Sequence, residues 1–349
     1  MLLPSPRGPL SAAIREVLLE SPGDGRDGVV AAAELLRQDG SQRDLLHDED
    51  FQITLFLLHA LHYRRIAGVD DRWEWDPDLL RVRQVLEDRF ETSLRELVDE
   101  EAPPIRTAED VAQVLFERAR NAPGPSVSRF VARRATQEQV LEWLVQKSPY
   151  QLMEADPHTW AIPRLTGPAK AALVEIQSDE YGGGIPGRMH AEMFRTTMAT
   201  AGLRTNYGAY LDHIPAITLA GVNAMTLFGL NRRLRGAVAG HLAMFEMTSS
   251  QPNRNYARGL RRLNWPEPAA AYFDEHVEAD AVHEQIAGRE LAGRLVEDHP
   301  DEWPNVLFGA DCALQLDRLA GEHYLESWTG GRTSLRKPLP SSARDEVVA

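Results

Sequence analysis

The residues with the clearest chemical potential lie in the segment His276-Val-Glu-Ala-Asp-Ala-Val-His283. His276, Asp280 and His283 are separated by four and three residues, so an α-helix would present all three side chains on one face. Two imidazoles and a carboxylate make a nitrogen and oxygen ligand set that suits iron, manganese or zinc. The alternative for this segment alone is a solvated polar face on which two histidines happen to align.

Two further segments place carboxylates where a folded chain seldom tolerates them. Glu180 closes an apolar helical run just before three glycines, and an acid at a helix C-terminus is unfavourable unless a cation lies nearby. Glu246 lies inside an apolar run, where a buried carboxylate is costly unless it is paired or binds a metal. His190 follows Glu180 by ten residues at the start of the next predicted helix. The simpler alternatives are a helix end that faces water and a histidine that packs or caps.

Helices must position these residues, because helical periodicity dominates the sequence and strand-like alternation is almost absent. The fold class is therefore predicted to be all-α. Helices are expected over residues 79–100, 109–120, 137–146, 166–180, 188–201, 214–229, 234–249, 268–296 and 306–325. Residues 121–126 contain two prolines and a glycine and are the predicted linker, and residues 329–349 are expected to form a disordered tail.

Length and composition limit the remaining possibilities. A chain of 349 residues exceeds the usual single-core limit of about 250–300 residues, which predicts one large domain plus an accessory segment. The net charge of −14 argues against binding to nucleic acid or to anionic membranes. Cys312 is the only cysteine, so any metal must be held by histidines and carboxylates.

The first nineteen residues are interrupted by prolines and by Arg7, and they lack the apolar core of a signal peptide. No stretch approaches the roughly 18 apolar residues that a membrane span needs. We therefore expect a cytoplasmic protein with neither a membrane nor a nucleic-acid partner.

In order and spacing, the candidate ligands resemble those of the heme-oxygenase-like diiron oxidases and oxygenases, a family of iron-containing redox enzymes. The resemblance covers about residues 148–325, roughly half of the chain. It implies a heme-oxygenase-like helical bundle that binds two Fe(II) per chain, with O2 as co-substrate and with no catalytic residues beyond the metal ligands. The implied ligands are Glu180, His190, Glu246, His276, Asp280 and His283.

The nitrogen-oxidising members of this family carry an additional glutamate upstream, and Glu154 stands at a suitable distance before Glu180. Many members place the first Glu and His on one continuous helix, whereas Gly182–Gly184 and Pro186 intervene here. The nitrogen-oxidising members share this longer spacing. The resemblance therefore implies an O2-dependent diiron oxygenase that N-oxygenates a small amine or amino-acid-derived substrate in specialised metabolism.

Two alternatives remain open at this stage. One is a diiron oxidase that cleaves C–C bonds or decarboxylates an aliphatic acid, and the other is a non-catalytic helical iron-binding protein. Residues 1–122 are expected to form a helical accessory region for homodimerisation, and residues 127–328 the diiron domain. An external electron donor is a further expected partner. Tyr181, Tyr207 and Tyr210 are candidates for the substrate pocket, with packing as the simpler account of Tyr207 and Tyr210.

Overall fold

The computed structural model describes the chain except for residues 24–27, 31, 33, 35–43, 99–101 and 340–349, and the side chains of residues 278–281 are likewise not described. Within the described part every regular element is helical, which confirms the all-α fold class. The α-helices are α1 (Pro9–Leu19), α3 (Glu49–Ala60), α4 (Pro77–Leu97), α5 (Ala108–Arg120), α6 (Val127–Arg133), α7 (Gln137–Gln151), α8 (Asp156–Thr159), α9 (Gly167–Glu180), α10 (His190–Thr200), α11 (Ala216–Leu230), α12 (Arg235–Arg262), α13 (Ala271–Gln285), α14 (Arg294–Asp298) and α15 (Trp303–Thr329).

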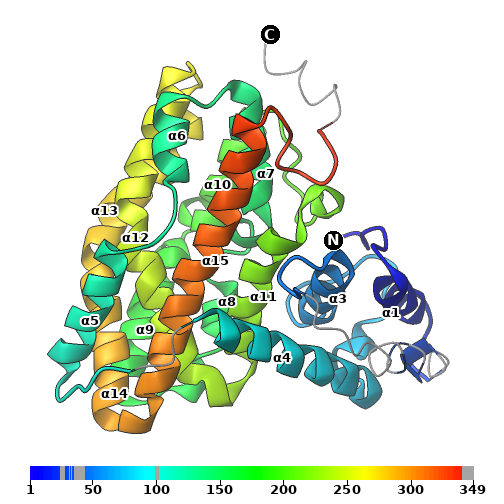
Figure 1. Cartoon of the computed structure of the whole chain (residues 1–349), viewed down its shortest axis with the longest axis horizontal. Helices are drawn as coiled ribbons and strands as arrows, with labels where there is room; N and C mark the ends of the chain where they lie inside the picture. Colours follow the sequence, from blue (N-terminus) through cyan, green and yellow to red (C-terminus); the bar gives the residue numbers. More distant parts are fainter. Residues whose placement is uncertain (24–27, 31, 33, 35–43, 99–101, 340–349) are drawn as a thin grey trace.

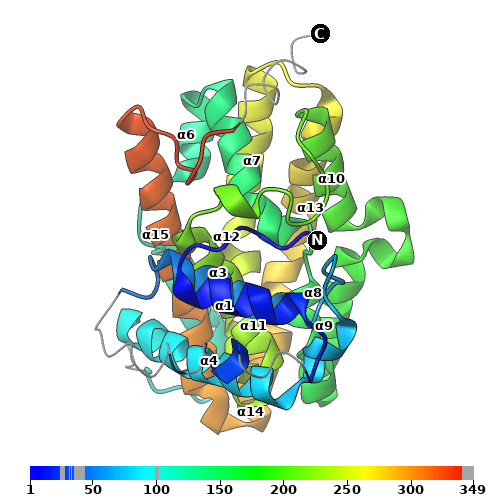
Figure 2. The same cartoon turned by 90° about the vertical axis from the view of Figure 1, so that its right-hand side faces the viewer.

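Long helices form an upright bundle, and the N-terminal helices α1, α3 and α4 lie against its lower half (Figure 1). In the perpendicular view of Figure 2, α1 and α4 run across the long axis of the bundle. Helix α12 lies at the centre of the bundle and packs against α6, α13 and α15. Two glycines permit its close approach to α15: a Cβ atom at Gly240 would overlap the carbonyl oxygen of Val306, and one at Gly309 would overlap that of Ala237.

The N-terminal region shares its core with the bundle. Ten of the twelve residues of α3 are buried, and this helix packs on α11, which is itself buried on nearly all sides. Asn223 of α11 donates hydrogen bonds to the backbone and side-chain oxygens of Gln52 at 2.9 and 2.8 Å. The assignment of residues 1–122 to dimerisation stays a prediction, because these contacts are all within one chain.

Two of the helices that continue past the ends expected from the sequence run through a proline. Helix α7 passes Pro149 and ends at Gln151, and α12 passes Pro252 and ends at Arg262. Proline cannot donate to the carbonyl four residues earlier. In α7 that carbonyl, of Val145, instead accepts a hydrogen bond from the Ser148 hydroxyl at 2.8 Å.

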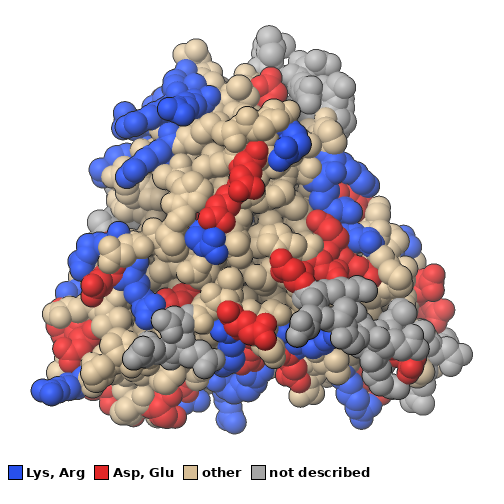
Figure 3. Space-filling view, in the orientation of Figure 1, with Lys and Arg blue, Asp and Glu red and all other residues tan. Residues whose placement is uncertain are grey.

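The segment after α15 differs from the disordered tail expected there. Ser334 and Leu335 are buried, and the backbone N–H of Ser334 donates to Glu142 at 2.8 Å. Residues 340–349 lie outside the described part of the chain. None of the described helices is long and apolar enough to cross a lipid bilayer. Acidic and basic side chains are interspersed on the face shown in Figure 3, with Lys and Arg gathered at the end of the bundle where α6 lies.

Candidate metal centre

Glu180 and His190 meet because three glycines reverse the chain between them. Glu180 is the last residue of α9, and His190 is the first of α10. Gly182, Gly183 and Gly184 all adopt positive φ angles of 66, 60 and 80°, a conformation that residues with a Cβ atom seldom take. The turn brings His190 Nδ1 to 3.0 Å from Glu180 Oε2.

Glu154 reaches the same place from the turn between α7 and α8. The next residue, Ala155, has a φ angle of +74°, which is strained for a residue other than glycine. Its carbonyl accepts a hydrogen bond from the Gln177 side chain of α9 at 2.8 Å, which holds the turn against that helix. The strained backbone thus fixes the direction in which Glu154 leaves the turn.

The carboxylates and imidazoles form two clusters with one residue in common. Ligand-type atoms of Glu154, Glu180, His190 and His276 all lie within 4.8 Å of one another. Those of Glu180, Glu246 and His283 satisfy the same limit. All six side chains are buried. The geometry therefore consists of two adjoining sites with the Glu180 carboxylate between them.

Buried polar atoms in these clusters lack hydrogen bonds to the described residues. They are Glu180 Oε2, His190 Nδ1 and His283 Nδ1. His190 Nδ1 lies 3.0 Å from Glu180 Oε2 and His283 Nδ1 lies 3.5 Å from Glu246 Oε2, yet His190 Nδ1 and His283 Nδ1 are not in hydrogen-bond geometry. Buried polar groups in folded proteins are nearly always satisfied, so unsatisfied atoms need an explanation. A metal cation held between them would provide it, and the donor set of imidazoles and carboxylates fits iron.

Each histidine of α13 is oriented by a partner on the side away from its cluster. His276 Nδ1 lies 2.8 Å from the backbone carbonyl of Tyr272, so it must carry the proton and leave Nε2 for a metal. His283 Nε2 lies 3.0 Å from Asp179, which leaves Nδ1 facing Glu246. The Tyr272 hydroxyl also lies 2.7 Å from both oxygens of Glu154.

Sequence reasoning missed Tyr272 and Asp179, although weak signals were available. Tyr272 stands one helical turn before His276 and therefore on the same face of α13. Asp179 directly precedes Glu180 at the end of α9. Neither position indicates its partner without the three-dimensional structure, since Tyr272 contacts Glu154 in the turn between α7 and α8, and Asp179 of α9 contacts His283 of α13.

The charges of the clusters stabilise one another despite their burial. Burial would raise the pKa of Glu180, but the nearby imidazoles, led by that of His190, lower it to about 2. Burial lowers the pKa of His283, but Glu246 and Asp179 outweigh it and raise this pKa to about 9. The nearby carboxylates thus favour the protonated forms of His190 and His283, and metal binding would have to displace those protons.

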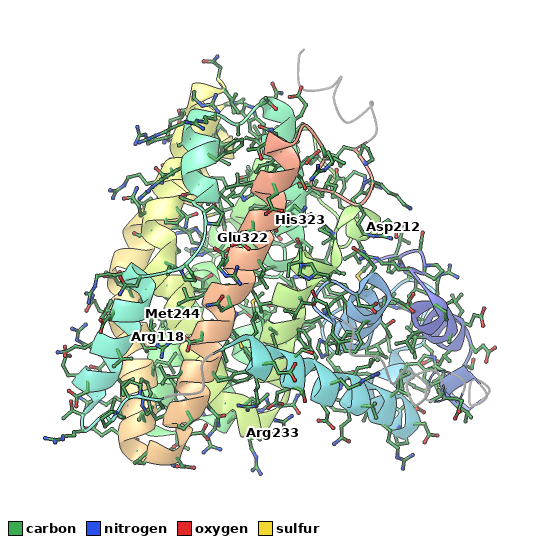
Figure 4. The ribbon with its side chains drawn as sticks, viewed as in Figure 1. Arg118, Asp212, Arg233, Met244, Glu322 and His323 are labelled. Carbon is green, nitrogen blue, oxygen red and sulfur yellow. The ribbon has the colours of Figure 1, made fainter. Side chains whose placement is uncertain are left out.

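A cavity of about 320 Å³ extends from the clusters toward the surface. Glu154, Glu180, Glu246 and His276 line its inner end. Aromatic side chains form much of its wall, namely Trp143, Tyr150, Phe194, Phe245, Tyr256, Tyr272 and Phe273. Met244 of α12, also a lining residue, lies between α5 and α15 in the view of Figure 4. At the outer end the wall is formed by residues 122–126, the linker between α5 and α6.

The structure brings together five of the six ligands predicted from the sequence, together with Glu154. Asp280 lies on α13, but its side chain is outside the described part of the chain. The three tyrosines predicted for the pocket do not belong to the lining of this cavity. Their hydroxyls are engaged elsewhere: that of Tyr181 donates to Asp156, that of Tyr207 to the Pro149 carbonyl, and that of Tyr210 accepts from the Arg204 N–H.

Comparisons with known proteins agree with this geometry. A family profile described as "Iron-containing redox enzyme" matches residues 141–318, a range that includes both clusters. A protein named nitrosourea synthase, from Streptomyces achromogenes subsp. streptozoticus, is 27% identical over 198 residues. That alignment covers 56% of this chain but only 42% of the relative, so the chain corresponds to less than half of that protein.

Proposed function

This chain belongs to the iron-containing redox enzymes, and from that premise we propose that it is an O2-dependent non-heme diiron oxygenase that N-oxygenates a small amine or amino-acid-derived substrate. Membership in the family confirms the resemblance, the helical fold and the oxidoreductase class expected from the sequence. A non-catalytic iron-binding protein is accordingly set aside.

The observation that carries the proposal is the pair of clusters joined at Glu180. One iron would be held by Glu154, Glu180, His190 and His276. The other would be held by Glu180, Glu246 and His283, with Asp280 proposed from its place on the α13 helix. When bound, two ferrous ions would supply the electrons and the coordination positions for activating O2. Oxygen-rich ligand sets such as these suit the higher oxidation state of iron.

Glu154 supports nitrogen oxidation over the alternative oxidase chemistry. The resemblance to the nitrogen-oxidising members implies this additional glutamate, and ligand atoms of Glu154 and Glu180 lie within 4.8 Å of each other. The relative is named for making a nitrosourea, a compound with an oxidised nitrogen. Tyr272 holds Glu154 in place, and the aromatic cavity wall excludes water and positions a substrate beside the clusters.

Insertion of one oxygen atom of O2 into an N–H bond consumes two electrons and two protons, because the second oxygen atom leaves as water. The proposal therefore includes an external electron donor. It also retains the homodimer expected from the sequence.

Anaerobic loading with Fe(II) tests the metal site, and O2 consumption tests the chemistry. The proposal expects about two irons per chain and amine-dependent O2 uptake that gives a product heavier by one oxygen atom. Uptake driven only by aliphatic acids, with loss of CO2, would support the oxidase alternative. A stoichiometry fixed at one iron, with excess Fe(II) and no O2, would overturn the diiron assignment.

A further inference from the structure

Helix α7 presents a stripe of three different side chains to the cavity. Trp143, Lys147 and Gln151 are spaced four residues apart, so they stand above one another on one helix face, and all three line the cavity. Glu154 follows in the turn after this helix. The stripe thus leads from the aromatic wall past a cation and an amide to a proposed metal ligand.

Among the described residues, Lys147 is the only lysine or arginine in the lining of the cavity. The chain has 38 basic residues, of which only Lys147, Lys170 and Lys337 are lysines. Its ammonium group lies 4.0 Å from Asp317, whose side chain is 81% exposed, whereas that of Lys147 is only 30% exposed. Ion pairs with so exposed a partner contribute little, so Asp317 offers weak competition for a ligand anion.

Gln151 adds an acceptor beside this cation. Its Oε1 atom is buried and has no hydrogen-bond partner among the described residues. A buried carbonyl-type oxygen without a donor costs free energy, and a ligand N–H group would remove that cost. Lys147 and Gln151 also line a second cavity of about 110 Å³, so they stand where the two spaces adjoin.

We propose that Lys147 and Gln151 bind the head group of an α-amino acid substrate, with the carboxylate on Lys147 and the ammonium on Gln151 Oε1. A cation and an unpaired acceptor one helical turn apart match the two charges of that head group. The substrate side chain then runs along the aromatic wall, and its nitrogen reaches the clusters at Glu154 and Glu180. This orientation rests on the proposed function, whereas the head-group site itself does not.

The site is tested by the binding of amino acids and of the amines that lack their carboxylate. Isothermal titration calorimetry with the full-length, iron-loaded protein under anaerobic conditions would compare lysine with cadaverine, arginine with agmatine, histidine with histamine and tyrosine with tyramine. At least one amino acid should bind about 10- to 100-fold more tightly than its amine, the range for a charge-assisted interaction. Equal binding within every pair, or no binding of any amino acid, would overturn the proposal.

Variants locate the effect at Lys147. Lys147→Met should abolish the preference for the amino acid, and Lys147→Arg should retain much of it, whereas Lys170→Met on α9 is the matched control and should change nothing. Because the chain has three lysines, acetylation followed by mass spectrometry provides a second measurement that needs no variant. The bound amino acid should protect Lys147 and leave Lys170 equally reactive, and unprotected Lys147 would contradict the assignment.

These measurements separate the two proposals. If an amino acid binds in a way that depends on Lys147 but no nitrogen is oxidised, the head-group site is supported and the proposed reaction is ruled out. If nitrogen is oxidised with the same rate and Michaelis constant in Lys147→Met, the proposed reaction is supported and the head-group site is ruled out.

Discussion

Replacing Tyr272 by phenylalanine removes one hydroxyl from the wall of the metal centre and changes little else. The hydroxyl lies 2.7 Å from both oxygens of Glu154, but it has a single proton, so the loss amounts to one shared hydrogen bond. Both side chains are buried. Partners of this kind typically change metal affinity about 10- to 100-fold, and we expect that decrease for the iron bound by Glu154.

Asp179→Ala should have a smaller effect, although it also removes a partner from a ligand. The Asp179 side chain is 62% exposed and makes one contact of 3.0 Å with His283. Water can take its place, so the expected decrease is only about a few-fold. The assay is anaerobic titration with Fe(II) against a competing chelator, fitted to two sites.

Tyr256→Phe is the control for the loss of a hydroxyl from the same cavity wall. Its ring stacks on Trp143 at 4.1 Å between centroids, so this variant should bind iron as the wild type does. If Asp179→Ala weakened binding more than Tyr272→Phe, or if Tyr272→Phe left both affinities unchanged, then Glu154 would not be a metal ligand supported by Tyr272.

Glu180→Ala should abolish binding at both sites while Glu246→Ala loses one iron, and iron analysis after desalting would distinguish them; equal losses would contradict the shared carboxylate. His276→Ala and His283→Ala should each lose one iron and all turnover but keep their helical circular dichroism. Asp280→Ala should only weaken one site, and Glu278→Ala, on another face of α13, should be nearly silent. Burial lowers the pKa of His158 to about 4. Between pH 6.5 and 4 this side chain is therefore protonated in the unfolded chain but neutral in the folded chain. The free energy of unfolding should therefore fall by up to about 3 kcal/mol between pH 6.5 and 4, and denaturant titrations of His158→Gln should show a shallower pH dependence than the wild type.

Much of the candidate metal centre could be predicted because its residues fall at helix ends and on one helix face. The spacing of His276 and His283 fixes their common direction, and the glycines after Glu180 mark the turn that returns the chain to His190. Glu154 could be proposed only through the family resemblance, since its position depends on the strained turn at Ala155. No pattern in the sequence indicates that turn.

The differences between the expected and the observed helices come from contacts that the sequence pattern does not show. The helices expected to end at residues 146 and 249 continue through Pro149 and Pro252 to Gln151 and Arg262, and in α7 the Ser148 hydroxyl bonds to the carbonyl that the proline leaves without a donor. The extension of α7 places Gln151 one turn above Lys147, a relation that the shorter helix would not include. Packing was the simpler account of Tyr207 in the sequence, and its hydroxyl donates to the carbonyl of Pro149.

If both clusters bind iron as proposed, the sharing of Glu180 makes the two sites thermodynamically dependent. The first ion to bind uses negative charge that would also attract the second, and it adds a positive charge nearby, so the two binding events should be anticooperative. At limiting iron, a population of chains would then fill mainly one site each. A preparation with half its iron would contain mostly singly loaded chains rather than equal numbers of full and empty ones, and its activity would fall well below half.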